Sequence, residues 1–525
     1  MLAIGFAARR KISSSLDFFL AGRGLPAWVT GLAFVSANLG VIEILGMAAN
    51  GAQYGAMTVH YYWIGAVPAM VFLGVVMMPF YYRSKVRSGP EFLRRRFNGA
   101  TQLLNAIMFA VAQILIAGVN LYALALVMEA LLGWPLPVSV VVSALIVLSY
   151  ITLGGLSSAI YNEVLQFFVI LAGLIPLTVL GLIKVGGVSG LFDRVRRSAL
   201  GEGGLHTWAG TAGASPMQAH WIGIVFGLGF VLSFGYWTTN FAEVQRALSA
   251  RNTNAARMTP IIAAFPKLFI PLVTVLPGMI ALVLFGDLGK GQDYNDAIPL
   301  LMRDLLPNGV LGVAVTGLPA SFMAGMAADI SGFNTVFTND IWQAHVRPDQ
   351  PDGPYLPDGH YLNVGRAATV AGVALGVGTA FIEAGYSNIM NYLQALFSFF
   401  NAPLFATFVL GLFWRRMTPW AGFWGLPAGT GSAFASYFAY KAGVVDFGTE
   451  LNAGFWGAGL AFAVDVLVSV IVTLVTTPKP EEELRGLVYG LSNVYLAGDR
   501  RWCRSPVLLG GGAVILAALL YEVIL

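Results

Sequence analysis

The stretch FNTVFTNDIW, residues 333–342, is a polar segment at the end of a long apolar run that begins near Val310. A second carboxylate, Asp329, lies inside that run. Carboxylates and amides are costly to hold at membrane depth, and by default they mark the path of a substrate, an ion or a proton. Two interpretations stay open for Asp340: it lines such a path, or it caps the cytoplasmic end of the helix. For Asp329, the position favours a transport path.

The composition indicates a membrane protein. Hydrophobic residues make up 57% of the 525 residues and charged residues only 11%, whereas soluble domains are about 25% charged. Apolar runs of roughly 20 residues, each long enough to cross about 30 Å of hydrocarbon, recur along the chain. The sequence therefore predicts an all-α polytopic membrane protein that lies in the lipid bilayer. The expected spans are 26–49, 57–82, 102–132, 138–154, 158–184, 219–245, 258–285, 309–336, 364–386, 388–414, 418–441, 453–477 and 505–524.

Several classes of function lack their signatures. The chain has five histidines, the single Cys503, no HExxH and no Cys/His cluster, which argues against a metalloenzyme and against a bound cofactor. No GxxxxGKS or GxxxxGKT occurs, so an ATP-driven pump is not expected. The net charge of +4 comes from basic loops and does not indicate nucleic-acid binding. No nucleophile–base signature of an enzyme is present.

The N-terminal segment MLAIGFAA is too short to span a bilayer, and Arg9, Arg10 and Lys11 follow it. This order fits neither a signal peptide nor a complete helix. We expect that the true start lies upstream or that an outer helix has been lost.

The spans form two sets of five, about 26–184 and 219–414. Most basic loops fall on one side when the helices alternate, and the positive-inside rule makes that side cytoplasmic; the loop 185–217 is an exception. An odd number of helices per set places the second set upside down, as in many secondary transporters. The prediction is one transmembrane domain, 1–525, with peripheral helices at about 418–441, 453–477 and 505–524.

Two of the spans contain polar interruptions. SANLGVIE at 36–43 places Asn38, Gly40 and Glu43 within an apolar helix, and SFGYWTTN at 233–240 interrupts the sixth span. In inverted-repeat transporters, helices break at the midplane, where unwound carbonyls bind a cation. The alternative is that the small residues only let helices pack closely, which leaves Glu43 unexplained.

These features resemble the sodium/solute symporter family, within its sodium/sugar branch. The order and spacing of several stretches carry the resemblance: DFFLAGRGLPAW at 17–28, SGPEFLRRRFN at 88–98, YITLGGLSSAIYNEVLQ at 150–166, VQRALSA at 244–250, FPKLFIPLVTVLPGM at 265–279, LLPNGVLG at 305–312, FNTVFTNDIW at 333–342, NVGR at 363–366 and FVLGLFWRR at 408–416. The resemblance implies a LeuT-type core of five plus five inverted helices with extra helices outside it. It also implies that sodium entry drives uptake of a sugar or another small solute.

The resemblance implies a solute site in which only some residues are those of the family. The residues at the positions of the family's sugar pocket and its gates are Glu43, Met47, Tyr61, Tyr62, Ser233, Tyr236, Lys267 and Gln394. The family's galactose pocket has glutamine, glutamate, asparagine and serine where this chain has Glu43, Tyr62, Ser233 and Gly65, respectively. These differences argue against galactose and leave room for another sugar or for an acidic or aminated solute.

The resemblance also places a sodium site between the first and eighth spans. Ser36 and Leu39 match carbonyl ligands on the first span. The positions that supply a carbonyl and two serine hydroxyls on the eighth span hold Ser321, Ala324 and Gly325, so both hydroxyls are missing.

Two carboxylates stand near the expected ion path. Asp329 shares a helical face with Ser321 and Gly325, and we expect it to replace the missing ligands or to carry a proton. The alternative is that Asp329 or Glu43 only pairs with Lys267. Glu163 stands where the family has an aspartate on the sodium exit route; it serves the same purpose or faces cytoplasmic water.

The sequence thus predicts a secondary active symporter of the plasma (inner) membrane. It would couple inward movement of a cation, sodium by expectation, to uptake of a sugar or similar small polar solute by alternating access. The alternatives are proton-coupled or sodium-independent transport of a non-sugar solute, and a transporter-like solute sensor. The solute, the stoichiometry and the oligomeric state stay open.

Overall fold

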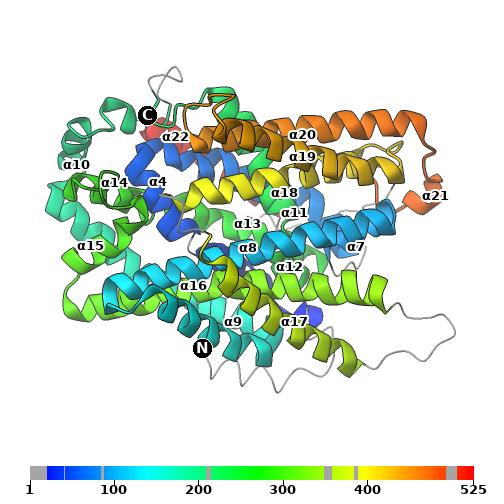
Figure 1. Cartoon of the computed structure of the whole chain (residues 1–525), viewed down its shortest axis with the longest axis horizontal. Coiled ribbons are helices and arrows are strands. Elements are labelled where there is room, and N and C mark those ends of the chain that lie inside the picture. The colour runs from blue at the N-terminus through cyan, green and yellow to red at the C-terminus, as the bar shows by residue number, and fades with distance from the viewer. Residues whose placement is uncertain are drawn as a thin grey trace.

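The computed structural model describes residues 20–40, 42–83, 88–208, 215–347, 358–382, 388–491 and 505–524. Within these ranges the regular elements are all helical, with two isolated bridges, Leu25 to Ala250 and Leu288 to Gln292. The helices run largely side by side along the long axis of the molecule (Figure 1). This arrangement confirms the all-α class.

The principal helices follow one another along the whole chain. Their bounds are α3 Ala27–Asn38, α4 Met47–Tyr54, α5 Val67–Phe72, α6 Met78–Arg83, α7 Gly89–Arg96, α8 Gly99–Leu132, α9 Leu136–Val185, α10 Gly187–Arg196, α11 Phe234–Thr239, α12 Phe241–Leu248, α13 Thr253–Phe269, α14 Val275–Leu284, α15 Ala297–Leu305, α16 Asn308–Val336, α17 Asp358–Thr379, α18 Ile389–Phe413, α19 Pro419–Lys441, α20 Glu450–Val475, α21 Glu481–Leu484 and α22 Pro506–Ile524. π-Helices extend or join several of them: η2 Ile42–Gly46, η4 Tyr61–Ala66, η5 Leu73–Met77, η8 Gly223–Ser233 and η11 Phe337–Val346.

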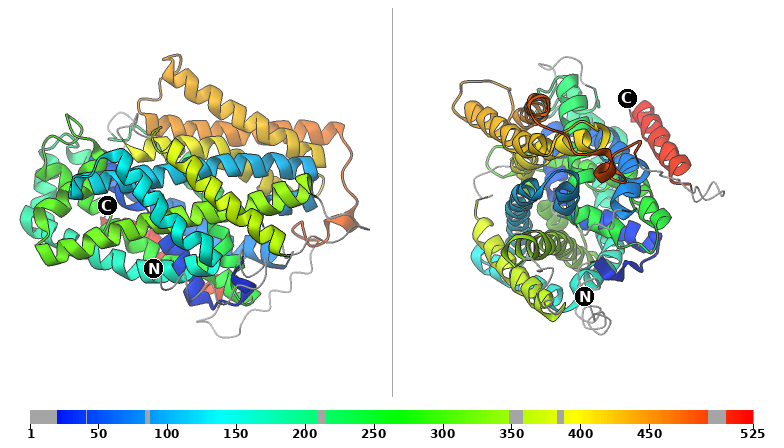
Figure 2. Two further views of the ribbon diagram at one scale, coloured as in Figure 1. Left: turned by 60° about the horizontal axis from the view of Figure 1, so that its bottom comes forward. Right: turned by 90° about the vertical axis from the view of Figure 1, so that its right-hand side faces the viewer.

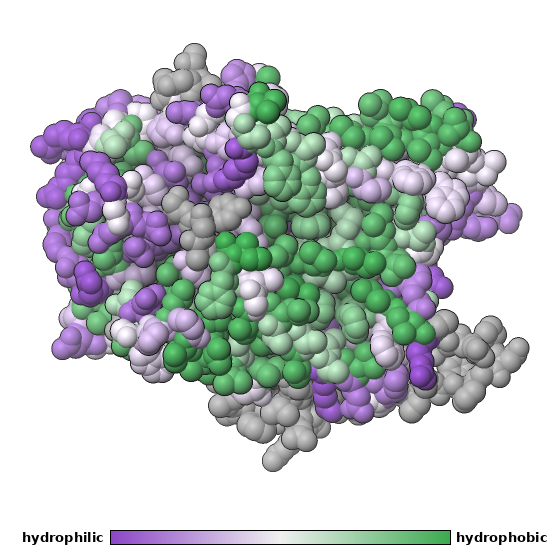
Figure 3. Space-filling view, viewed as in Figure 1, coloured by the Kyte–Doolittle hydropathy of each residue, from purple (hydrophilic) through white to green (hydrophobic). Residues whose placement is uncertain are grey.

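The helices form a membrane-spanning bundle. In the described part of the chain, seven helices are long and apolar enough to cross a bilayer, and two bent pairs bring the number to as many as nine. An apolar band covers the middle of the face shown in Figure 3, and polar side chains gather toward its ends. Such a band between polar ends fits a protein whose waist lies in hydrocarbon.

The first span breaks where SANLGVIE predicts it. α3 ends at Asn38, and the chain resumes as a helix at Ile42 with its direction changed by 58°. Leu39, at the C-terminal cap, has φ −76° and ψ 45°, which are not helical values. The break therefore leaves backbone groups of α3 outside the regular helical ladder.

The second break lies at Asn240, the last residue of the predicted stretch 233–240. The chain bends there by 51° between Gly223–Thr239 and Phe241–Leu248. The Asn240 side chain accepts a hydrogen bond from the Ala242 amide at 3.1 Å and so caps α12. The residues before it are helical in α11, so the unwinding is confined to Asn240 and does not extend over SFGYWTT.

The remaining helices surround these two breaks. α16 packs against α3, α8, α9 and α12, which brings its middle to the first break. α9 carries both predicted spans, 138–154 and 158–184, without an intervening loop. α19 and α20 pack together on one side of the molecule, and α22 lies at its edge (Figure 2).

Candidate solute and cation site

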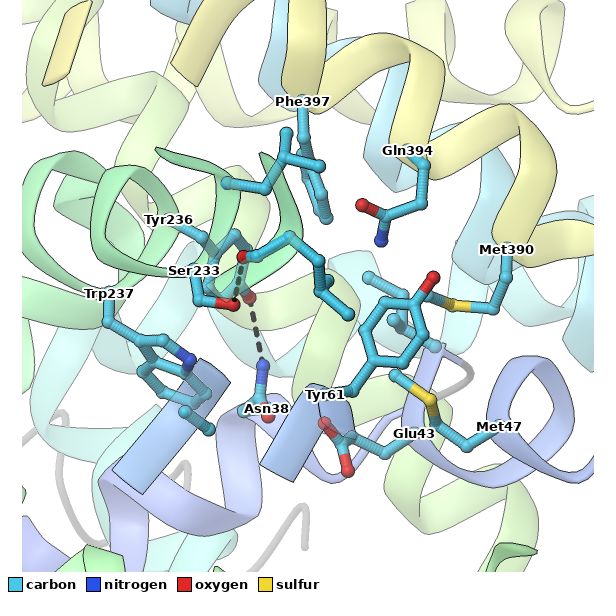
Figure 4. A pocket seen from close by; sticks show the side chains of 14 residues that line it. Asn38, Glu43, Met47, Tyr61, Ser233, Tyr236, Trp237, Met390, Gln394 and Phe397 are labelled. Carbon is cyan, nitrogen blue, oxygen red and sulfur yellow. Dashed lines mark hydrogen bonds between the residues drawn. The ribbon is translucent and has the colours of Figure 1, made fainter. Parts of the chain in front are cut away.

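A small cavity, with about 50 Å³ of space for the centre of a water-sized sphere, lies beside the first break and is bounded by η2, η4, η8, α11 and α18. Six of the eight residues predicted to bind solute line it: Glu43, Met47, Tyr61, Ser233, Tyr236 and Gln394. Figure 4 shows these side chains reaching toward a common space from different helices. The other lining residues are Asn38, Ile42, Ala66, Leu228, Leu232, Trp237, Met390 and Phe397.

Lys267 lies behind the cavity wall. Its ammonium group donates to Glu43 Oε1 at 2.7 Å and also contacts Asn38 Oδ1. It stands 5.0 Å from the ring centre of Trp237 and 5.6 Å from that of Tyr62, distances at which a cation is attracted to an aromatic face. Of the two carboxylates that the sequence offers as partners for Lys267, the structure pairs it with Glu43.

Several acceptor atoms of the cavity wall have no hydrogen-bond partner within the described structure: Glu43 Oε2, Gln394 Oε1 and the Tyr61 hydroxyl. All three residues are buried. Buried polar groups normally find a partner. Their common place on the cavity wall therefore suits a solute that brings its own hydroxyl or amine donors.

Tyr62 and Ser233 are engaged elsewhere. The Tyr62 hydroxyl lies 3.0 Å from Thr274 Oγ1, and neither residue lines the cavity. The Ser233 hydroxyl donates to the Leu228 carbonyl at 2.8 Å. A Cβ atom at Gly65 would lie only 2.5 Å from Ser233 Oγ, so the serine that the family has at this position does not fit beside Ser233 in this arrangement.

A chain of polar contacts leads from the cavity toward the second break. Asn38 Nδ2 donates to the Tyr236 hydroxyl at 2.9 Å, and that hydroxyl donates to Glu243 Oε1 at 3.1 Å. Because Lys267 contacts both Glu43 and Asn38, these contacts link Glu43 to Glu243 through buried side chains and the half-buried Tyr236. Sequence reasoning noted Asn38 only as a helix interruption and missed Glu243, although a carboxylate seven residues after Tyr236, near an expected break, is a usable signal.

The predicted cation ligands meet where α3 ends against α16. The Leu39 amide donates to the Ser36 carbonyl at 3.0 Å, and the Ser321 hydroxyl contacts the Leu39 carbonyl. Gly325 lies one turn further along α16, and a Cβ atom at Gly40 would be 3.5 Å from its Cα. Ala324 belongs to the same helix, and its side chain is outside the described part. The fold thus brings Ser36, Leu39, Ser321 and Gly325 together.

Asp329 has a partner that the sequence did not suggest. Asn120 Nδ2, on α8, donates to Asp329 Oδ2 at 2.9 Å, and both side chains are buried. The carboxylate therefore faces an amide of the third span.

Glu163 is buried against Arg246 in an ion pair whose two side chains are almost fully enclosed. Arg246 also contacts the Ala242 carbonyl, at the start of α12. The interpretation in which Glu163 faces cytoplasmic water is therefore wrong: the guanidinium group satisfies it inside the protein.

Asp340 does not cap a helix end. It lies within η11, which continues to Val346, and it accepts a hydrogen bond from Gln102 Nε2 at 2.8 Å. Asp340 is 1% exposed. The capping interpretation is wrong, because the helix runs on past the polar stretch and packs it against α8.

Comparison with known proteins relates the chain to transporters. A model of the sodium:solute symporter family matches residues 18–429. The sodium/glucose cotransporter of Vibrio parahaemolyticus is 28% identical over 421 residues, 77% of this chain and 76% of that protein. The sodium/mannose cotransporter of Bos taurus is 30% identical over 459 residues, 82% of this chain and 75% of its own length.

Solved structures share the fold. The outward-open, substrate-bound form of a Na⁺-coupled sialic acid symporter superimposes with a TM-score of 0.75 at 20% identity, covering 91% of this chain and 95% of that one. A closed transporter of the nucleobase-cation-symport-1 family gives 0.54 at 15% identity, covering 90% and 97%. Together with the family match over most of the chain, these findings identify the protein as a multi-pass membrane member of the sodium:solute symporter family, a sodium-coupled solute symporter and not an enzyme.

Proposed function

We propose that this symporter takes up a sugar or a closely related polyhydroxylated solute across the plasma (inner) membrane. The observation that carries this proposal is the cavity beside the first helix break, with its three unpartnered acceptors Glu43 Oε2, Gln394 Oε1 and Tyr61 hydroxyl. A polyol offers several donors at once, and each buried acceptor left unpaired costs roughly 1–3 kcal/mol. The names of the relatives, sodium/glucose and sodium/mannose cotransporters, support the same class.

In this proposal the eight residues of the solute site have different roles. Glu43, Gln394 and Tyr61 bind solute hydroxyls, while Met47 and Ser233 shape the wall. Tyr236 closes the cytoplasmic side through its bonds to Asn38 and Glu243. Lys267 and Tyr62 do not line the cavity and act through Glu43. Lys267 holds the Glu43 carboxylate in place, and the Tyr62 ring lies 5.6 Å from the Lys267 ammonium group.

The coupling ion would be sodium, bound where the break after α3 meets α16. Ser36, Leu39, Ser321, Ala324, Gly325 and Asp329 form the proposed ion site, and Glu163 stands on the exit route. The architecture would be five plus five inverted helices, which the positions of the two breaks support: each lies in the first span of its set of five. Rocking of the helix bundle about these breaks would give alternating access.

A second candidate is proton coupling. The specific observation in its favour is that position 325, a serine in the family's sodium site, is a glycine here, while the buried carboxylate of Asp329 lies one turn away on the same helix. A carboxylate can carry a proton in place of binding sodium.

Uptake into proteoliposomes tests both candidates. We expect a labelled hexose or inositol to accumulate above its outside concentration when sodium is high outside. Sodium-independent equilibration of every polyol in the panel, without accumulation, would contradict the proposal. Accumulation driven by a pH gradient alone would select the proton.

A further inference from the structure

Asn120, in the middle of α8, is a buried amide that the family resemblance does not assign to any site. It is 3% exposed. Its nitrogen donates to the Ile116 carbonyl at 3.3 Å and to Asp329 Oδ2 at 2.9 Å. Because a backbone carbonyl only accepts, the nitrogen must face Ile116, and this fixes the oxygen on the opposite side. That oxygen, Oδ1, has no hydrogen-bond partner in the described structure.

The unpartnered oxygen points at the junction of the first break and α16. A Cβ atom added to Gly325 would lie 2.8 Å from Asn120 Oδ1, and one added to Gly40 would lie 3.4 Å from it. Gly40 directly follows Leu39, and Gly325 stands at a position matched to a serine ligand. The amide oxygen of Asn120 therefore occupies the space that a serine side chain at 325 would fill.

We propose that Asn120 Oδ1 is a ligand of the coupling cation, supplying from the third span an oxygen that replaces a missing serine hydroxyl of the eighth. The proposal rests on the proposed cation site between the α3 break and α16. Hard cations prefer oxygen ligands, and side-chain amide oxygens bind them well. Asp329 is then a positioning residue: it holds the amide nitrogen, so that the oxygen faces Gly40, which follows Leu39, and Gly325, one turn after Ser321.

The competing explanation is that Asn120 only ties α8 to α16 through Asp329. Buried amides between membrane helices commonly have such a packing function. The two explanations differ in one respect, since a packing amide cannot be replaced by a hydroxyl on another helix, whereas a ligand oxygen can.

Equilibrium binding of radioactive sodium to the purified protein in detergent, without solute, separates the two explanations. Asn120→Ala should weaken sodium affinity roughly 10- to 100-fold, the size expected for one lost polar contact to a charge. Gly325→Ser alone should also weaken it, because the new side chain collides with Asn120. The double variant Asn120→Ala/Gly325→Ser should recover to within about threefold of the wild type, because the serine then has room and restores the oxygen.

Two matched variants control the experiment. Asn120→Ala/Gly325→Ala fills the same space without a hydroxyl and should stay as weak as Asn120→Ala. Gln102→Ala removes another buried amide of α8 that donates to a carboxylate, Asp340, and it should bind sodium normally. If Asn120→Ala is not monodisperse, the sodium affinities of Asn120→Ala/Gly325→Ser and Asn120→Ala/Gly325→Ala are compared with each other instead.

The outcomes are distinct. Wild-type affinity in Asn120→Ala, or equal affinity in the serine and alanine double variants, overturns the inference and leaves sodium coupling intact. A wild-type protein that binds no sodium overturns the proposed cation site together with the inference. Rescue by serine and not by alanine supports Asn120 as a ligand.

Discussion

The ammonium group of Lys267 lies 2.7 Å from Glu43 Oε1, and the two side chains are 1% and 6% exposed. The residues are 224 positions apart and come from α13 and η2, and of the two only Glu43 lines the cavity. Because the ion pair is internally neutral, it places no net charge beside the solute. It also leaves one carboxylate oxygen, Oε2, for a solute donor. The pocket therefore suits an uncharged, donor-rich solute better than an anion.

Breaking this pair should destabilise the protein. Lys267→Met leaves Glu43 as an unpaired buried carboxylate, a change that typically costs about 3–5 kcal/mol. The double variant Lys267→Met/Glu43→Gln removes both charges and should regain most of the lost stability. Thermal unfolding midpoints in detergent, without solute, measure both. The single variant Glu43→Gln completes the cycle. If the losses in Lys267→Met and Glu43→Gln simply add in the double variant, the pair is not formed.

Gln394→Ala should weaken solute binding by about 1–3 kcal/mol, because solute donors lose a buried acceptor. Little effect on the unfolding midpoint is expected, since the Oε1 atom bonds no protein group in the described structure. Isothermal titration with the transported solute provides the measurement. Met390→Ala removes an apolar side chain from the same cavity wall and serves as the control for volume. An undiminished affinity in Gln394→Ala would remove this residue from the site.

Tyr236→Phe should loosen the closure of the cytoplasmic side. The hydroxyl makes two bonds, to Asn38 and Glu243, each worth about 0.5–1.5 kcal/mol. Their loss should raise solute efflux from preloaded proteoliposomes, without a sodium gradient, by roughly tenfold. Tyr437→Phe, which removes a tyrosine hydroxyl that donates to Glu450 on the peripheral helices, is the matched control. Efflux equal to that of the control would separate Tyr236 from the gate.

The two helix breaks were predictable because Gly40, Glu43 and Asn240 interrupt otherwise apolar runs, and local sequence carries that signal. Pairings across the fold were not predictable. Asn120 meets Asp329 from 209 positions away, and nothing in the sequence of α8 distinguishes that amide from one that merely packs.

Arg96 and Arg246 each follow an apolar run, the usual place of a loop charge at the membrane interface, yet both are fully buried. Arg96 donates to the carbonyls of Gly411, Trp414 and Met417 at the end of α18, and Arg246 pairs with Glu163. A basic residue after an apolar run is ambiguous, since it can serve the membrane interface or the termini of neighbouring helices, and only the tertiary structure decides.

Asp329→Asn should show whether the negative charge of Asp329, rather than the shape of its side chain, is needed at the proposed cation site. The variant keeps a side-chain oxygen for Asn120 Nδ2, so the 2.9 Å contact and the fold should persist. It removes a negative charge that costs about 2.5–3.5 kcal/mol to insert into a membrane helix, so the unfolding midpoint should not fall. Sodium affinity and sodium-dependent uptake should both decline sharply, because the cation loses its nearby counter-charge. Wild-type sodium affinity and coupling in Asp329→Asn would make the carboxylate structural. A wild-type protein that ignores sodium but accumulates solute when the outside is acidic, with that accumulation lost in Asp329→Asn, would instead identify Asp329 as the proton carrier.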